Sequence, residues 1–261
     1  MINLSEIISF MEKTFPLSYA EDFDNVGLLC GKRNKEVSKV LICLDCTNAV
    51  VNEAIESGCE LIISHHPLIF EPIKSVSDDS PLGKLIISAI ENNISIYSAH
   101  TNLDSAKGGL TDYIANLLGL EIIGNLENNL GRILKAPEDF TAKDLIQSLK
   151  TALGIERVYT TLKENKPIEK IALCNGGGSD LIDSAMESGA DVYISGDLKH
   201  HNILSVNESK KLDYIEIRHY DCEAPMKRLV CDLLKKEFGE KIEVRIASSC
   251  KAPLIDADNI M

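Results

Sequence analysis

The chain has 261 residues, of which 44% are hydrophobic and 26% charged, and it carries a formal net charge of −13. This composition is ordinary for a globular protein of one large or two smaller domains. No apolar run approaches the roughly 18 residues of a membrane-spanning helix, and the first residues do not form a secretory signal, so we expect a cytoplasmic protein. The acidic balance disfavours nucleic acid as a partner, but it is compatible with a nucleotide bound to metal.

Eight cysteines occur in the chain, and Cys43 and Cys46 form a Cys-x-x-Cys pair. This spacing is typical of zinc ribbons and of redox motifs, but no second pair accompanies it. We therefore expect a buried strand cysteine beside a turn cysteine, and reduced thiols throughout. The site predicted below does not depend on this pair.

An amphipathic helix is expected at the amino terminus. Apolar residues follow helical spacing over residues 4–15, with Asn3 and Glu6 placed as a capping pair. A polar turn at residues 21–25 follows. Its Asp24 could cap the turn or reach a binding site, and spacing favours the turn.

A strand–helix–strand unit spans residues 40–64. An unbroken apolar run predicts a buried strand at 40–44, then a helix over 49–57 that ends at Gly58, and then a second strand at 61–64. Parallel strands joined in this way have their carboxyl ends on the same side. Ligands bind at that edge of open α/β sheets.

The same unit recurs further along the chain. Shifting the sequence by 131 residues lays Val40–Ser64 over Ile171–Ser195 without a gap, and Cys43 then falls on Cys174. A shared strand–helix–strand plan explains such a match better than chance does. We therefore expect two related α/β lobes whose strand ends could enclose a site.

The remaining segments complete the expected α/β pattern. Between the copies we expect helices at 85–92, 110–118 and 141–153, strands at 94–98 and 157–161, a loop at 101–104 and a crossover from 121 to 137. After the second copy we expect a strand at 214–217, a helix from Asp221 to Phe238 and a strand at 242–247. Within the second copy, Asn175–Gly178 is expected to be a tight turn, the alternative being that its amides face a substrate anion.

Side chains that bind metal ions follow several of these strands. His65 and His66 come directly after the second strand, and neighbours on an extended segment point to opposite sides, so each suits a different ion. Further candidates are Asp104, His219 and Glu223, of which Glu223 could bridge two ions. Such a mixed set suits Zn²⁺, Fe²⁺ or Mn²⁺, and two ions about 3.5–4 Å apart generate a nucleophile at neutral pH. The alternative is that the imidazoles cap backbone groups, and spacing alone leaves both interpretations open.

The other three histidines are expected to orient ligands or to face a substrate rather than to bind metal. They are His100, His200 and His201.

Five segments together resemble, in order and spacing, the GTP cyclohydrolase 1 type 2 homologue family, also called the Nif-three-like dinuclear metal proteins. The segments are Glu-Asp-Phe-Asp-Asn-Val-Gly-Leu (21–28), Ser-His-His-Pro-Leu-Ile-Phe (64–70), His-Thr-Asn-Leu-Asp (100–104), Gly-Asp-Leu-Lys-His-His (196–201) and His219-x-x-x-Glu223. One segment alone would be weak evidence, whereas the five cover nearly the whole chain. Phe23 stands where the family usually has Trp.

The resemblance implies two similar, interlinked α/β lobes with a metal site between them, in a compact form without a mid-chain insertion. The first lobe would cover residues 1–125 and carry the His-His-Pro and Asp ligands. The second would cover residues 126–261, and its part from 213 to 261 would return to complete the metal site.

Two divalent metal ions per subunit (Zn, Fe or Mn) are implied as cofactors. By resemblance, His66 and Asp104 bind one ion, His65 and His219 bind the other, and Glu223 bridges both. The subunits would form a toroidal homohexamer with the dinuclear centre facing its inner cavity.

The resemblance further implies a hydrolase of the GTP cyclohydrolase type that acts on a nucleotide or a related small molecule. A metal-bound hydroxide would attack the substrate, and His100 or His201 would be the catalytic group that transfers protons. The alternative is a non-catalytic ring assembly that binds, regulates or delivers metal. A third option is a structural metal that joins the lobes, in which case a chelator would lower stability without affecting a ligand pocket.

Overall fold

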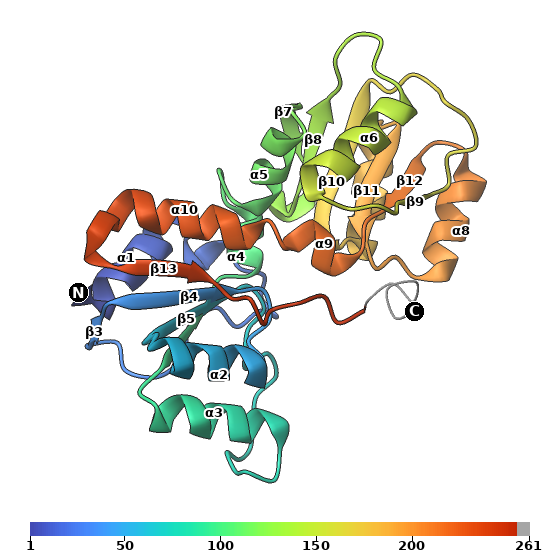
Figure 1. Cartoon of the computed structure of the whole chain (residues 1–261). Coiled ribbons are helices and arrows are strands. Elements are labelled where there is room, and N and C mark those ends of the chain that lie inside the picture. The colour runs from blue at the N-terminus through green and yellow to red at the C-terminus, as the bar shows by residue number, and fades with distance from the viewer. Residues whose placement is uncertain (255–261) are drawn as a thin grey trace. The chain divides into compact units, whose positions relative to one another are not determined.

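The computed structural model describes residues 1–254, which form a mixed α/β fold (Figure 1). The chain divides into two compact units. The first unit contains residues 1–106 and the described chain from Met226 onward, and the second contains residues 107–225. These units differ from the predicted lobes, because residues 107–125 join the second unit and the chain returns to the first unit at residue 226.

A five-stranded sheet forms the centre of the first unit, in the order β13-β4-β5-β6-β2. Its strands are β2 (Gly27–Cys30), β4 (Lys39–Cys43), β5 (Leu61–Ser64), β6 (Ser95–Ser98) and β13 (Glu243–Ile246). All neighbours pair in parallel except β2, which runs antiparallel to β6 at one edge. A separate two-stranded ladder joins β1 (Ile2–Asn3) and β3 (Glu36–Val37).

Helices cover both faces of this sheet. They are α1 (Leu4–Thr14), α2 (Asn48–Ser57), α3 (Pro81–Glu91), α4 (Thr101–Ser105) and α10 (Met226–Phe238), with short 3-10 turns η1 (Leu17–Tyr19) and η4 (Gly239–Lys241). In Figure 1, α1 and α10 lie on one face and α2 and α3 on the other. The red α10 and β13 therefore complete a unit that begins with the blue amino terminus.

The predicted amino-terminal helix is confirmed as α1. Asn3 accepts a hydrogen bond from the Ser5 backbone N–H (3.0 Å), and Glu6 accepts one from the Asn3 N–H (3.1 Å), which together form a capping box. Further along, the prediction of a loop at 101–104 is wrong. That segment is α4, because Asp24 accepts from the backbone N–H of Thr101 (3.1 Å) and so satisfies the first turn of a helix.

A six-stranded sheet forms the second unit, in the order β7-β8-β10-β11-β12-β9. Its strands are β7 (Glu121–Asn125), β8 (Gly131–Lys135), β9 (Tyr159–Thr160), β10 (Lys170–Gly177), β11 (Val192–Gly196) and β12 (Asp213–Glu216). The three middle strands β10, β11 and β12 are parallel, and the outer pairings are antiparallel. The unit's helical segments are α5 (Leu110–Leu117), η2 (Glu127–Asn129), α6 (Ala142–Leu153), η3 (Ser179–Leu181), α7 (Ile182–Glu187), α8 (His200–Ser209) and α9 (His219–Glu223).

Two predictions for the chain around this unit are wrong. The expected crossover from 121 to 137 is the antiparallel pair β7–β8, closed by a turn in which Asn128 and Asn129 take the left-handed conformation that asparagine tolerates. The expected single helix from Asp221 to Phe238 is two helices, α9 and α10. They are separated at Pro225, which has no N–H to continue a helix.

The internal repeat extends to strand register and polar contacts. Val40 pairs with Leu61 in the first unit, and Ile171 pairs with Val192 in the second, which are equivalent positions under the shift of 131 residues. Lysines at equivalent positions also donate hydrogen bonds to the carbonyl groups at the ends of the equivalent helices. Lys39 Nζ donates to Ser57 O (3.1 Å), and Lys170 Nζ donates to Ser188 O (2.9 Å).

Equivalent carboxylates bind the start of the first strand in each copy. Glu60 accepts from the backbone N–H of Ser38 (3.0 Å) and Lys39 (2.8 Å). Asp191 accepts in the same way from Glu169 (2.8 Å) and Lys170 (2.9 Å). Each strand–helix–strand unit thus has the same two polar contacts, one from a lysine to the end of the helix and one from a carboxylate to the start of the first strand.

Among residues 1–254, no helix combines the length and the apolar character needed to traverse a lipid bilayer.

Candidate metal centre

Three histidines converge in the first unit, where β5 and β6 end. One possible ligand nitrogen from each of His65, His66 and His100 lies within 4.8 Å of the others, and their ring centroids are 5.1 to 5.4 Å apart. The expectation that His65 and His66 point to opposite sides is wrong. Both follow the last residue of β5, and both donate their backbone N–H to Leu44 O (3.1 Å each), so strand alternation no longer applies.

Asp104 joins this cluster from α4. Its carboxylate is almost fully buried, and Oδ1 lies 3.5 Å from His65 Nε2. The loop that was expected to carry Asp104 is instead the short helix that brings it toward His65. We call His65, His66, His100 and Asp104 the first half-site.

Each imidazole of the first half-site is held through Nδ1 by an oxygen atom. The contacts are His65 Nδ1 to Ala99 O (2.8 Å), His66 Nδ1 to Asp45 Oδ1 (2.7 Å) and His100 Nδ1 to Asp24 Oδ1 (2.9 Å). A carbonyl or carboxylate oxygen accepts a hydrogen bond, so in each ring Nδ1 carries the proton. In the neutral ring Nε2 then has the lone pair that a metal ion requires, which is the usual arrangement of metal-binding histidines.

Asp24 reaches the half-site, so the expectation that it only caps a turn is wrong. Its side chain is fully buried and accepts hydrogen bonds from His100 and from both the N–H and the hydroxyl of Thr101. Burial raises the pKa of Asp24, but hydrogen bonding to His100, the charge of His100 and the bonds from Thr101 outweigh it and lower the pKa to about 2. Asp24 therefore stays ionised and fixes His100.

Two exposed phenylalanines border the first half-site, and we call them the aromatic rim. Phe23 is 64% exposed and Phe70 is 43% exposed, and their ring centroids lie 6.3 Å apart. The Phe70 ring also meets the His100 ring edge to face at 6.3 Å. Asn25 Nδ2 donates to Ile69 O (2.6 Å), which ties the two segments together.

A second pair of candidate ligands lies in the second unit, and we call it the second half-site. His219 begins α9, and its Nε2 lies 3.0 Å from Glu223 Oε2 one turn later. His219 Nδ1 bonds to Asp197 Oδ2 (2.8 Å). The hydrogen bond with Glu223 is the largest cause that raises the pKa of His219 to about 9; burial opposes it, and Asp197 adds to it.

Gly176 makes room for this pair. A Cβ atom there would lie 2.2 Å from Glu223 Oε1 and 3.5 Å from His219 Cε1, and the residue has a φ of +66°. The prediction of a tight turn at Asn175–Gly178 is wrong, since β10 continues to Gly177. Glycine is required at position 176 because the Glu223 carboxylate packs directly against the backbone.

His200 and His201 are exposed at the start of α8. Neither belongs to a group of three possible ligand side chains among residues 1–254. The catalytic role of His201 therefore stays a prediction.

Sequence reasoning missed two of the carboxylates behind the histidines, Asp45 and Asp197, and it favoured a turn role for the third, Asp24. Asp45 follows β4, which pairs with β5, and Asp197 follows β11, which pairs with β12. Asp24 precedes β2, whose start lies at the end of β6 because the two strands are antiparallel. An acidic residue at the end of the strand next to a histidine-bearing strand is a signal that could have found them.

The donor chemistry of both half-sites fits a metal ion. Oriented imidazoles and buried carboxylates are the ligands of Zn²⁺, Fe²⁺ and Mn²⁺ in mixed sites. The residues able to hold an ion are His65, His66, His100 and Asp104 in the first unit and His219 and Glu223 in the second.

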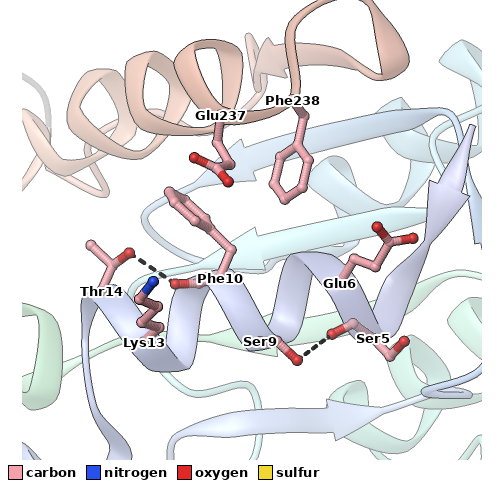
Figure 2. A pocket seen from close by; sticks show the side chains of 8 residues that line it. All are labelled: Ser5, Glu6, Ser9, Phe10, Lys13, Thr14, Glu237 and Phe238. Atoms are coloured by element: carbon pink, nitrogen blue, oxygen red, sulfur yellow. Dashed lines mark hydrogen bonds between the residues drawn. The ribbon is translucent and has the colours of Figure 1, made fainter.

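An open groove of about 550 Å³ lies elsewhere in the first unit, between α1 and the end of α10 (Figure 2). Phe10 and Phe238 meet edge to face on its wall, with centroids 5.5 Å apart. The hydroxyls of Ser9 and Thr14 donate to α1 carbonyls at 2.7 and 2.8 Å, so they serve the helix itself. The groove has no histidine in its lining, and its carboxylates, Glu6 and Glu237, belong to no group of three possible ligand side chains among residues 1–254.

Fold and half-sites together define an α/β protein with a candidate metal centre. Residues 2–253 match the family model described as Duf34/NIF3 (NGG1p interacting factor 3), and the chain belongs to this family. It is 37% identical over 259 residues to the GTP cyclohydrolase 1 type 2 homolog of Clostridium perfringens, covering 97% of this chain and 98% of that protein. It is 29% identical to NIF3-like protein 1 of Drosophila melanogaster, covering 97% and 88%.

Solved structures show the same fold over nearly the full length. The Bacillus cereus protein related to NIF3 has a TM-score of 0.88 at 25% identity, covering 98% of this chain and 99% of that one. Reduced HcgD from Methanocaldococcus jannaschii has a TM-score of 0.84 at 29% identity, covering 95% and 98%. The family resemblance predicted from sequence, and the α/β fold it implied, are confirmed.

Proposed function

We propose that this protein is a metal-dependent hydrolase that acts on a nucleotide or a related small molecule. The observation that supports this most strongly is the shared anchoring of His65, His66 and His100 through Nδ1, which leaves Nε2 of each ring for a metal ion while the ring centroids lie 5.1 to 5.4 Å apart. Relatives carry the name GTP cyclohydrolase 1 type 2 homolog, which makes ring opening of GTP the first reaction to test.

Two divalent ions, of Zn, Fe or Mn, are the proposed cofactors. We assign His66 and Asp104 to one ion, His65 and His219 to the other, and Glu223 to both. Bound there, such ions supply Lewis acidity and a nucleophile at neutral pH. The protein's part is to fix the tautomer and the orientation of each imidazole, which Asp45 does for His66 by accepting from Nδ1.

His100 is the proposed proton-transfer residue. Asp24 accepts from its Nδ1, so His100 exchanges protons with a substrate through Nε2. The ring is partly buried beside His65 and His66, whereas His201 is exposed. His201 remains the alternative for this role.

The aromatic rim favours a planar ring in the substrate. An aromatic base stacks on a phenylalanine face, and Phe70 lies against His100 at the edge of the proposed reaction site. We expect Phe23→Ala to raise KM for a purine nucleotide more than it lowers kcat, and Phe23→Trp to restore KM. A KM unchanged in Phe23→Ala would count against base stacking.

The decisive experiment is a hydrolysis screen on protein loaded with Zn²⁺, Mn²⁺ or Fe²⁺, with GTP as the first substrate. We expect turnover that His66→Ala abolishes together with metal binding. His200→Ala is the matched control, since His200 is an exposed histidine outside both half-sites, and it should retain activity. Full metal occupancy without turnover of any nucleotide would contradict the proposal.

The alternative is a non-catalytic ring assembly that binds, regulates or delivers metal. It predicts rapid exchange of bound ions with a chelator and no turnover. The homohexamer proposed by family resemblance is common to both functions, and light scattering of the purified protein tests it.

A further inference from the structure

Two cysteines flank Asp45, one at the end of a strand and one in the loop that follows it. Cys43 is the last residue of β4, and Cys46 precedes Thr47, whose hydroxyl accepts from Val50 N–H (3.4 Å) and caps α2. A Cys-x-x-Cys pair between a strand and a helix is the setting of thioredoxin-like redox motifs. The expected burial is confirmed for Cys43, while Cys46 is partly exposed.

The two thiols are in contact. The Cys46 side chain is hydrogen-bonded to Cys43, and burial, together with this neighbour, raises the pKa of the Cys43 thiol well above its usual range. The Cys43 thiol is therefore shielded from solvent, whereas the Cys46 thiol is accessible to solvent and to small oxidants.

A third thiol lies beside the pair in a different role. Cys250 Sγ accepts a hydrogen bond from the Leu44 backbone N–H (3.3 Å). The preceding residues are fixed by Glu53, which accepts from the N–H groups of Ser248 (2.9 Å) and Ser249 (2.8 Å). Cys250 thus supports the backbone of the loop between the two cysteines.

The loop links the thiols to the first half-site. Asp45 lies between Cys43 and Cys46 in the sequence, and its carboxylate holds His66 Nδ1 at 2.7 Å. A covalent bond between the two sulfurs would constrain the backbone on both sides of Asp45. Any shift of its carboxylate changes the orientation of His66.

We propose that Cys43 and Cys46 form a reversible disulfide that weakens metal binding at the first half-site through Asp45. The Cys46 sulfur attacks a hydroperoxide, which gives a Cys46 sulfenic acid and releases an alcohol or water. The Cys43 sulfur then attacks the Cys46 sulfur, the S–S bond forms, and the sulfenic oxygen leaves as water. The two thiols supply two electrons to the peroxide, and a small dithiol reverses the reaction.

Disulfide formation is tested on the full chain with hydrogen peroxide, followed by alkylation and peptide mass spectrometry. We expect two of the eight thiols to be lost and a Cys43–Cys46 link to be found. Cys46→Ser should abolish the link, whereas Cys59→Ser, a buried thiol beyond α2, should leave it intact. Oxidation of Cys46 without a link, or a link to Cys250, would overturn the proposal.

The effect on metal binding rests on the proposed function and is tested separately. Mn²⁺ is the probe, because it prefers nitrogen and oxygen ligands to thiolates. We expect the dissociation constant of Mn²⁺ to rise about tenfold or more on oxidation, as for loss of a residue that orients a ligand, and to recover with dithiol. Cys46→Ser should show no response to peroxide.

The outcomes separate the two ideas. A mapped disulfide with unchanged Mn²⁺ affinity overturns the coupling and leaves the proposed metal centre standing. Failure of the reduced protein to bind Mn²⁺, Zn²⁺ or Fe²⁺ overturns the proposed metal centre and the coupling, while the disulfide itself is judged by the peptide map.

Discussion

The imidazole of a histidine has two nitrogen atoms, and in this site Nδ1 already makes a hydrogen bond to the protein, which leaves Nε2 for a ligand. In the first half-site a carbonyl or carboxylate oxygen accepts from Nδ1 of each ring. Such contacts fix the tautomer and the angle of the ring, so the residue that binds metal and the residue behind it act together. Replacing Asp24 or Asp45 therefore tests the site without removing a ligand.

Asp24 makes stability depend on pH in a predictable direction. Its pKa is lowered to about 2 from the ordinary value of 3.8, so the folded state favours the ionised form. The contribution is fully present above about pH 4 and is lost as the pH falls toward 2; for a buried carboxylate it amounts to about 2 kcal/mol. We expect Asp24→Asn to lose about that much in urea unfolding at pH 7.

The difference between Asp24→Asn and the unchanged protein should shrink as the pH falls below 4. Asp78→Asn, at an exposed position, is the control and should match the unchanged protein at every pH. A gap that stays constant from pH 7 to pH 3 would show that the lost stability does not come from ionisation of Asp24.

Gly176 gives a prediction with a neighbouring control. Gly176→Ala would place a Cβ atom 2.2 Å from Glu223 Oε1 at a φ of +66°, whereas a Cβ at Gly177 meets nothing within 4 Å. We expect Gly176→Ala to cost at least about 1 kcal/mol and to displace the Glu223 carboxylate. Gly177→Ala should be nearly neutral. Thermal unfolding and metal stoichiometry measure the two effects, and equal behaviour of the variants would refute the assigned role of Gly176.

In both copies of the strand–helix–strand repeat, a carboxylate at an equivalent position accepts hydrogen bonds from the backbone at the start of the first strand. Burial raises the pKa of Glu60, but hydrogen bonds from Lys39 and Ser38 outweigh it and lower the pKa, so the ionised group is the one that binds the strand. We expect Glu60→Gln to cost roughly 1–3 kcal/mol, because an amide oxygen replaces a carboxylate that accepts from two backbone N–H groups. Chemical denaturation measures this loss in the free energy of unfolding, with the exposed Glu56→Gln as control. Similar free energies of unfolding for the two variants would show that the hydrogen bonds of Glu60 to the backbone do not stabilise the protein.

Elements with local signals could be predicted from sequence, and elements that depend on distant partners could not. The capping pair at Asn3 and the glycine stop at Gly58 are local, and both predicted helices are confirmed. In β7, exposed and partly buried residues alternate, and β8 lacks a strong apolar run. The two strands form because β8 pairs with β10 some forty residues later. The break at Pro225 does have a local signal, because proline rarely continues a helix.

The residues of the candidate site likewise include some that could be predicted from sequence and others that could not. Side chains with metal-binding chemistry could be chosen from sequence, and the structure brings His65, His66, His100 and Asp104 together. The residues that hold the rings are aspartates, which are common in turns, and nothing local distinguishes Asp45 from a turn residue. Only strand pairing reveals which aspartate lies behind which histidine.

Metal binding at the proposed centre should stabilise the folded state of the protein. A ligand at a hundred times its dissociation constant adds about 2.7 kcal/mol to the free energy of unfolding. We therefore expect a chelator to lower the melting temperature of the metal-loaded protein and to have no effect on His66→Ala. A melting temperature that the chelator leaves unchanged in both proteins would contradict the proposed metal centre.

The path of the chain through its two units also sets the order in which they can be finished during synthesis. The second unit is one continuous stretch, whereas the sheet of the first unit lacks β13 until residues 243–246 have been made and can pair with β4. The unit encoded in the middle can thus be completed first, and the unit that starts the chain waits with an open edge on β4. A ribosome that stalls between residues 226 and 242 would hold a nascent chain with an unpaired strand, which is a template for aggregation.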